Sequence, residues 1–134
     1  MAPDGFRTGM PKKILIAEDE PSIALSLEFL LRGAGYEVAL ARNGSEAVRI
    51  GEREKPDLIV LDIMLPLLDG FEVCRHIRES GGLGHTRILM LTARGNDSAV
   101  EKGLMLGANA YMTKPFSTRD LIRTVGELLS ATER

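Results

Sequence analysis

The sequence predicts a single α/β domain in which helices cover both faces of a five-stranded parallel sheet. Short apolar segments alternate with longer segments of helical periodicity, in five strand–helix units. The apolar segments are uninterrupted, and residues 58–61 are the clearest case, as expected for strands buried on both faces. Regular alternation of this kind is typical of doubly wound parallel sheets with right-handed crossovers.

Length and composition are those of one ordinary globular domain. The 134 residues suffice for a hydrophobic core. The net charge of −2 and the lack of a basic run give no indication that this chain itself binds nucleic acid. Cys74 is the only cysteine, so no internal disulfide can form. Without a signal peptide or an apolar segment of membrane-spanning length, we expect a cytoplasmic protein and no membrane partner.

The domain is expected to begin after a short tail. Residues 1–11 are rich in Gly and Pro without periodicity and are predicted to form a flexible N-terminal tail, so that the domain covers residues 12–131. Within it, the short apolar runs mark the strands. The expected strands are residues 14–17, 37–40, 58–61, 88–91 and 110–113.

Each predicted strand is followed by a helix with a recognisable start or end. The starts are marked by Pro21, by Asn43 with Glu46, by Gly70, by Ser98 with Glu101, and by Ser117 with Asp120. Gly33 and Gly35 are expected to end the first helix with positive φ angles, and Gly107 to close the fourth helix.

Polar residues stand where the strands end. Glu18 and Asp19 follow the first strand, Asp62 the third, Thr92 the fourth and Lys114 the fifth. Because the carboxyl ends of parallel strands lie along one edge of a sheet, we expect these side chains to meet in one pocket. Three carboxylates repel one another unless a cation lies among them, and oxygen ligands of this type suit Mg²⁺. With a lysine and a hydroxyl beside them, the set can stabilise a phosphoryl group during transfer to an oxygen nucleophile.

Several of these residues belong to motifs in a fixed order. The acidic pair is followed by Asp62, the Thr92-Ala93 step, Tyr111 and the Lys114-Pro115 pair, with 30 residues from Asp62 to Thr92 and 22 from Thr92 to Lys114. In these motifs residues 12–130 resemble a response-regulator receiver domain of two-component signalling, similar to the chemotaxis regulators. The resemblance implies a flavodoxin-like sheet with strand order 2-1-3-4-5.

The resemblance also implies a phosphorylation site. Asp62 would take a phosphoryl group from the phosphohistidine of a histidine kinase or a histidine phosphotransfer protein, with Mg²⁺ as cofactor. The metal ligands would be Glu18, Asp19, Asp62 and the backbone carbonyl of Met64, while Lys114 would neutralise phosphoryl oxygens. The chemistry would be limited to self-phosphorylation and autodephosphorylation, so the chain is not expected to be an enzyme with a separate substrate.

The family's switch is implied as well. The Thr92 hydroxyl and the Tyr111 ring would respond to phosphorylation, and the bond before Pro115 would be cis. The face formed by the fourth helix, the fifth strand and the fifth helix would then change shape, as a population shift between two packings. The output would be a protein target or an output domain, and the chain ends soon after the fifth helix. A stand-alone regulator and the receiver of a longer protein both stay open.

Two departures from the family pattern concern the region beside Asp62. Leu67-Leu68 stands where glycine followed by an apolar residue is common, which adds bulk near the mouth of the site. By analogy, Met64 and Arg94 flank the water that attacks the phosphoryl group, and neither is a carboxylate or amide that would orient water. We therefore expect a long-lived phosphoaspartate.

The residues bear on three alternative functions. An aspartate-nucleophile, Mg²⁺-dependent phosphohydrolase needs an acid two residues after the nucleophile, and Met64 has no proton to give. A flavodoxin-type cofactor module needs a first loop with free amides, whereas residues 18–21 here are acidic and end in proline. A phosphorylation-independent binding module remains an alternative if the pocket does not react.

Overall fold

The computed structural model describes residues 11–131 and contains one five-stranded sheet in which all strands are parallel. The strand order is β2-β1-β3-β4-β5, which confirms the predicted order. The predicted tail, residues 1–11, lies outside the described residues except for Pro11. The strands are β1 Lys13–Ala17, β2 Glu37–Ala41, β3 Leu58–Asp62, β4 Arg87–Ala93 and β5 Ala110–Lys114.

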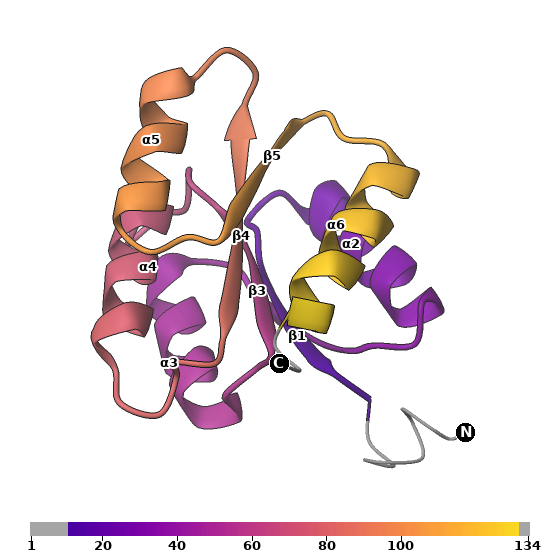
Figure 1. Ribbon diagram of the computed structural model, residues 1–134, viewed down its shortest axis with the longest axis horizontal. Helices are drawn as coiled ribbons and strands as arrows, with labels where there is room; N and C mark the ends of the chain where they lie inside the picture. The colour runs from indigo at the N-terminus through magenta and orange to yellow at the C-terminus, as the bar shows by residue number, and fades with distance from the viewer. Residues whose placement is uncertain (1–10, 132–134) are drawn as a thin grey trace.

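Five helices connect and follow the strands and cover both faces of the sheet, as predicted. In Figure 1, α3, α4 and α5 lie on one side of the sheet, and α2 and α6 lie on the other. Among the described residues, none of these helices is long and apolar enough to cross a membrane. The helices are α2 Pro21–Gly33, α3 Gly44–Glu54, α4 Gly70–Glu79, α5 Asp97–Met105 and α6 Thr118–Ala131.

The third strand supplies both hydrophobic cores, as its apolar run predicts. Leu58 and Val60 pack in the core beneath α2 and α6, whereas Ile59 and Leu61 pack in the core beneath α3, α4 and α5. All four are fully buried. Successive strand residues point to opposite faces, so a strand with a helical layer on each side has no polar positions until it ends.

Most of the predicted helix starts are confirmed. Pro21 is the first residue of α2, the Asn43 side chain accepts a hydrogen bond from the Glu46 amide, and Ser117 Oγ accepts one from the Asp120 amide. Before Gly70, Asp69 forms a complete capping box with Glu72, which satisfies two amides reciprocally at the start of α4.

Two local expectations are wrong. Ser98 does not cap α5, because the turn at Gly95 (φ 80°) already leads the chain into a helix at Asp97. Gly33 has no positive φ and is the last residue of α2, so Gly35 alone makes the left-handed turn after this helix. The expected role of Gly107 is confirmed by its φ of 112°, two residues after the end of α5.

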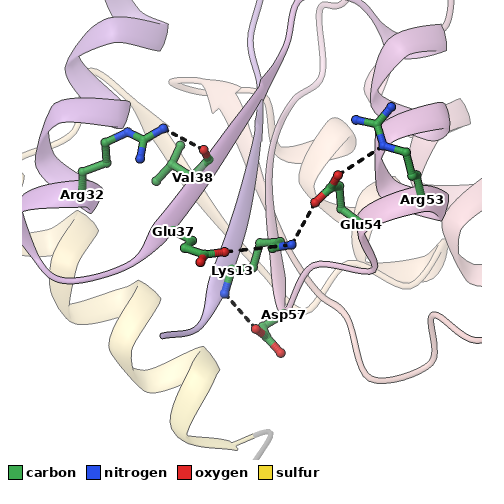
Figure 2. Close-up of polar contacts among 7 residues, drawn as sticks. All are labelled: Lys13, Arg32, Glu37, Val38, Arg53, Glu54 and Asp57. Carbon is green, nitrogen blue, oxygen red and sulfur yellow. Dashed lines mark hydrogen bonds and ion pairs between the residues drawn. The ribbon is translucent and has the colours of Figure 1, made fainter. Parts of the chain in front are cut away.

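The edge of the sheet where the strands begin is held by a charged network. Lys13 Nζ lies 2.8 Å from Glu54 Oε1, and the Lys13 amide donates to Asp57 Oδ2 at the same distance (Figure 2). Nearby, the Arg32 guanidinium donates to the Val38 carbonyl. These contacts tie β1 to the end of α3 and the end of α2 to β2, at the opposite end of the strands from the predicted site.

Candidate functional site

The strand register brings the predicted site residues to one edge of the sheet. Glu18 follows β1, and Asp62 is the last residue of β3. Asp62 pairs with Leu91, so Thr92 lies one residue further along β4. The next register position pairs Ala93 with Lys114, the last residue of β5. Their meeting at this edge is the arrangement that the sequence predicts.

Three carboxylates cluster at this edge. One oxygen from each of Glu18, Asp19 and Asp62 can be chosen so that all lie within 4.8 Å of one another. Glu18 and Asp62 are only 1% and 4% exposed, whereas Asp19 is open to solvent. Lys114 Nζ lies 3.0 Å from Glu18 Oε1 and 3.2 Å from Asp62 Oδ2. The single ammonium thus lies between the two buried carboxylates.

The charges of the cluster are out of balance. Burial raises the pKa of Glu18 and the Asp62 charge adds to this, although the Glu20 amide and Lys114 oppose it. Burial by itself would lower the pKa of Lys114, but the Glu18 and Asp62 carboxylates outweigh it and hold this pKa above its ordinary value. With all four groups ionised, the cluster carries an excess of two negative charges, which a divalent cation with oxygen ligands would neutralise.

Backbone amides orient the two buried carboxylates. The Glu20 amide donates to Glu18 Oε2 at 3.0 Å, which leaves the other oxygen toward Lys114. The Met64 amide donates to Asp62 Oδ1 at 3.3 Å, so the chain folds back over the aspartate directly after β3. The Met64 side chain is 79% exposed and takes no part in this contact.

The predicted switch residues lie near one another on the adjacent strands β4 and β5. Thr92 is buried and Tyr111 is 48% exposed. Both border a gap between β4, β5 and α5 that is too narrow to hold a water molecule, together with Ile63, Met90, Ala99, Val100, Leu104, Ala108 and Ala110. The Lys114–Pro115 peptide bond is cis, as expected, and Ala93 is exposed at the end of β4.

The sequence matches the response regulator receiver domain family over residues 14–126. The chain belongs to this family. The receiver domain is 48% identical over 124 residues to the alkaline phosphatase synthesis transcriptional regulatory protein PhoP of Bacillus subtilis strain 168. That match covers 92% of this chain and 51% of PhoP, so the chain spans about half the length of this relative.

Solved structures agree with this assignment. The receiver domain of the sensor histidine kinase PA1611 of Pseudomonas aeruginosa PAO1, with a magnesium ion in its active-site cleft, has a TM-score of 0.83 and 36% identity. That match covers 90% of this chain and 98% of the other. The chemotaxis response regulator CheY4 of Vibrio cholerae has a TM-score of 0.84 and 31% identity, covering 89% and 99%. The chain is therefore a receiver domain of two-component signalling with the fold of the chemotaxis regulators.

Sequence patterns do not predict every contact of the segment that follows Asp62. Gly44 lies at the first position of α3, far along the chain from Asp62, yet its amide donates to the carbonyl of Pro66 in the segment after Asp62. The available signal is a glycine directly after the N-cap residue Asn43, where a better helix former would be expected. That signal does not name the segment against which the glycine packs.

Proposed function

We propose that Asp62 is the phospho-acceptor of this receiver domain. The observation that carries the proposal is the position of its carboxylate, nearly buried at the edge of the sheet, with the Lys114 ammonium at 3.2 Å and two further carboxylates beside it. An Asp62 oxygen would attack the phosphorus of a phosphohistidine. A P–O bond to Asp62 would form as the P–N bond to the donor imidazole breaks.

The cofactor of this step is Mg²⁺. Glu18, Asp19, Asp62 and the Met64 carbonyl would hold the ion, which supplies positive charge to the phosphoryl oxygens when bound. The fit rests on the excess negative charge of the cluster and on the oxygen chemistry of its donors. The magnesium ion in the cleft of the PA1611 receiver supports the same reading.

Lys114 provides the second positive charge. In the structure its ammonium is held by Glu18 and Asp62, within reach of any group bound to Asp62. When Asp62 becomes an acyl phosphate, its carboxylate loses its negative charge. The Lys114 ammonium can then pair with a negatively charged phosphoryl oxygen instead. Because Lys114 is the last residue of β5, this contact links the chemistry to that strand.

The product of the reaction is a changed surface. The Thr92 hydroxyl would donate to a phosphoryl oxygen, and the Tyr111 ring would turn inward toward Thr92, with which it borders one narrow gap. The face formed by α5, β5 and α6 would then shift between two packings, biased by the new contacts. Apart from self-phosphorylation and autodephosphorylation, no catalysis is assigned to this domain.

The partners follow from this chemistry. The phosphoryl donor is a histidine kinase or a histidine phosphotransfer protein. The partner that binds the changed face is a protein target or an output domain. PhoP is a transcriptional regulatory protein about twice as long as the matched region, which favours an output domain. The exposed, apolar Met64 side chain argues against the phosphohydrolase, because it offers no acid to a leaving group.

Acetyl phosphate tests the proposal directly. The wild type, Asp62→Ala and the surface control Asp120→Asn would each be treated with and without Mg²⁺, and the intact mass would be measured. We expect one phosphoryl group on the wild type and on the control, only with Mg²⁺, and none on Asp62→Ala. An adduct on folded Asp62→Ala would refute the assignment, and no adduct on the folded wild type would favour the phosphorylation-independent binding module.

A further inference from the structure

The segment between β3 and α4, residues 63–69, is folded into consecutive tight turns. We call it the β3–α4 loop. Its internal hydrogen bonds run from the Leu65 amide to the Ile63 carbonyl at 3.0 Å and from the Leu68 amide to the Pro66 carbonyl at 2.9 Å. At its end, the Gly70 amide donates to the Ile63 carbonyl at 2.8 Å. The loop begins directly after the proposed acceptor and carries Met64, the proposed carbonyl ligand.

A second element holds this loop from outside. The Gly44 amide, at the start of α3, donates to the Pro66 carbonyl at 3.0 Å. Gly44 is buried, and a Cβ placed on it would overlap the Leu68 carbonyl oxygen and lie 2.6 Å from the Leu68 carbonyl carbon. Gly44 has no positive φ, so the requirement at this position is space for the loop and not backbone freedom.

Leu67 shows that the loop is constrained where Gly44 touches it. It lies between Pro66 and Leu68, with φ of 73° and a side chain that is 76% exposed. A leucine is disfavoured in this left-handed region, and an exposed side chain adds little packing to offset the cost. Such a conformation persists where its surroundings hold it, and the carbonyl that precedes Leu67 is the one that binds the Gly44 amide.

We propose that Gly44 is a positioning residue of the phosphorylation site, which acts through the β3–α4 loop. By holding Pro66 and Leu68 against the start of α3, it fixes the backbone that runs back through Met64 to Asp62. This inference rests on the proposed function, since the group positioned is the Met64 carbonyl toward Mg²⁺. Linkage is reciprocal, so Mg²⁺ binding should in turn strengthen the contact between Gly44 and the loop.

Calorimetric titration of the full chain with Mg²⁺ tests the inference. Gly44→Ala is compared with Gly126→Ala, a control at a helical position where nothing lies within 4 Å of the added methyl group. We expect Gly44→Ala to bind Mg²⁺ at least tenfold more weakly than the wild type, and Gly126→Ala to bind it equally well. A merely structural role would lower the stability of Gly44→Ala and leave the Mg²⁺ affinity of its folded form unchanged, and that result would overturn the inference.

A second measurement avoids the variant, because the added methyl group meets backbone atoms and can prevent folding. The amide exchange rate of Gly44 in the wild type would be measured without Mg²⁺ and at saturation. We expect slower exchange with Mg²⁺ by several-fold, and an unchanged rate would overturn the inference. If the wild type binds no Mg²⁺ at all, the proposed function fails first and the inference falls with it, which distinguishes the two failures.

Discussion

Glu18 shows at the scale of one residue that the acidic cluster lowers the stability of the fold when it is ionised. Its carboxylate is almost fully buried, with one oxygen held by the Glu20 amide and the other by Lys114. Burial nevertheless raises the pKa of Glu18, so these contacts do not make up for lost hydration. A buried carboxylate beside another carboxylate is the pattern expected of a ligand that awaits a cation.

Glu18→Gln should separate stability from metal binding. A raised pKa means that the folded state holds the Glu18 proton more tightly, so ionised Glu18 opposes folding at pH 7 and less so as the pH falls through this pKa. In EDTA at pH 7 the variant should therefore be at least as stable as the wild type in urea unfolding, and the difference in stability should shrink in acid.

Addition of Mg²⁺ should have the opposite effect on the comparison. A hundredfold excess of Mg²⁺ over its dissociation constant should stabilise the wild type by about 2.7 kcal/mol, and the Glu18→Gln variant by much less. Equal stabilisation of both would contradict a ligand role.

Met64→Asn should shorten the life of the phosphorylated state. The Met64 side chain is exposed beside Asp62 and cannot hydrogen-bond an attacking water, whereas an amide can. We expect faster loss of the phosphoryl group by about tenfold, equivalent to about 1.4 kcal/mol in the barrier. Decay would be followed by intact mass after removal of acetyl phosphate. Rapid decay of the wild type, unchanged in Met64→Asn, would refute the expectation of a long-lived phosphoaspartate.

At the scale of elements, Arg78 connects α4 to the far edge of the sheet. Its guanidinium donates to the carbonyls of Gly107 and Thr86 and to Asn109 Oδ1, at 2.8 to 2.9 Å. The same Asn109 oxygen accepts the Ile88 amide. One side chain thus joins α4, the start of β4 and the turn between α5 and β5.

Arg78→Ala should destabilise the fold without touching the site. Three acceptors would lose a charged donor, and in this half-buried position we expect the free energy of unfolding to fall by about 2–4 kcal/mol. Arg75→Ala, at an exposed position of the same helix, should change it by less than about 0.5 kcal/mol. Urea unfolding of both variants provides the measurement, and equal losses would show that the Arg78 contacts contribute little.

Across the whole molecule, the two edges of the sheet differ in their charge balance. The edge where the strands end gathers an uncompensated acidic cluster, whereas the edge where they begin balances its charges (Figure 2). Lys13 and Glu18 are separated by five residues of extended chain, or about 16 Å at 3.3 Å per residue. Changes at such separations are usually additive, so the two edges can be altered independently.

Glu54→Gln tests this independence through pH and salt. The Lys13 hydrogen bond holds the pKa of Glu54 below its ordinary value of 4.5, so its stabilising effect is present above that pH and lost as the pH falls through the lowered pKa. The pKa of Lys13 is raised above its ordinary value of 10.5. The stabilising effect of the pair is therefore lost again as the pH rises through this raised pKa. Between these limits Glu54→Gln should melt slightly lower than the wild type, and less so in high salt. Its Mg²⁺ affinity should be unchanged, and a weaker affinity would show that the two edges are coupled.

The sequence by itself determined the fold class and most of the site, because both depend on patterns that are local in the chain. Apolar runs and capping residues mark the strands and helices, and a parallel sheet carries the residue after each strand to a common edge. Glu18, Asp62, Thr92 and Lys114 were predictable for this reason. Where a start signal competed with a turn, as at Ser98 and Gly95, the backbone conformation of the turn prevailed.

Only the tertiary structure decided which distant groups touch. No sequence pattern indicates that the Lys114 ammonium lies between the carboxylates of Glu18 and Asp62. The same holds for the contact of Arg78 with Asn109 and for the packing of Gly44 against the β3–α4 loop. Such contacts depend on side-chain reach and on free space between elements that are far apart in the chain. Both quantities are set when the two helical layers close on the sheet, and neither is encoded within any one element.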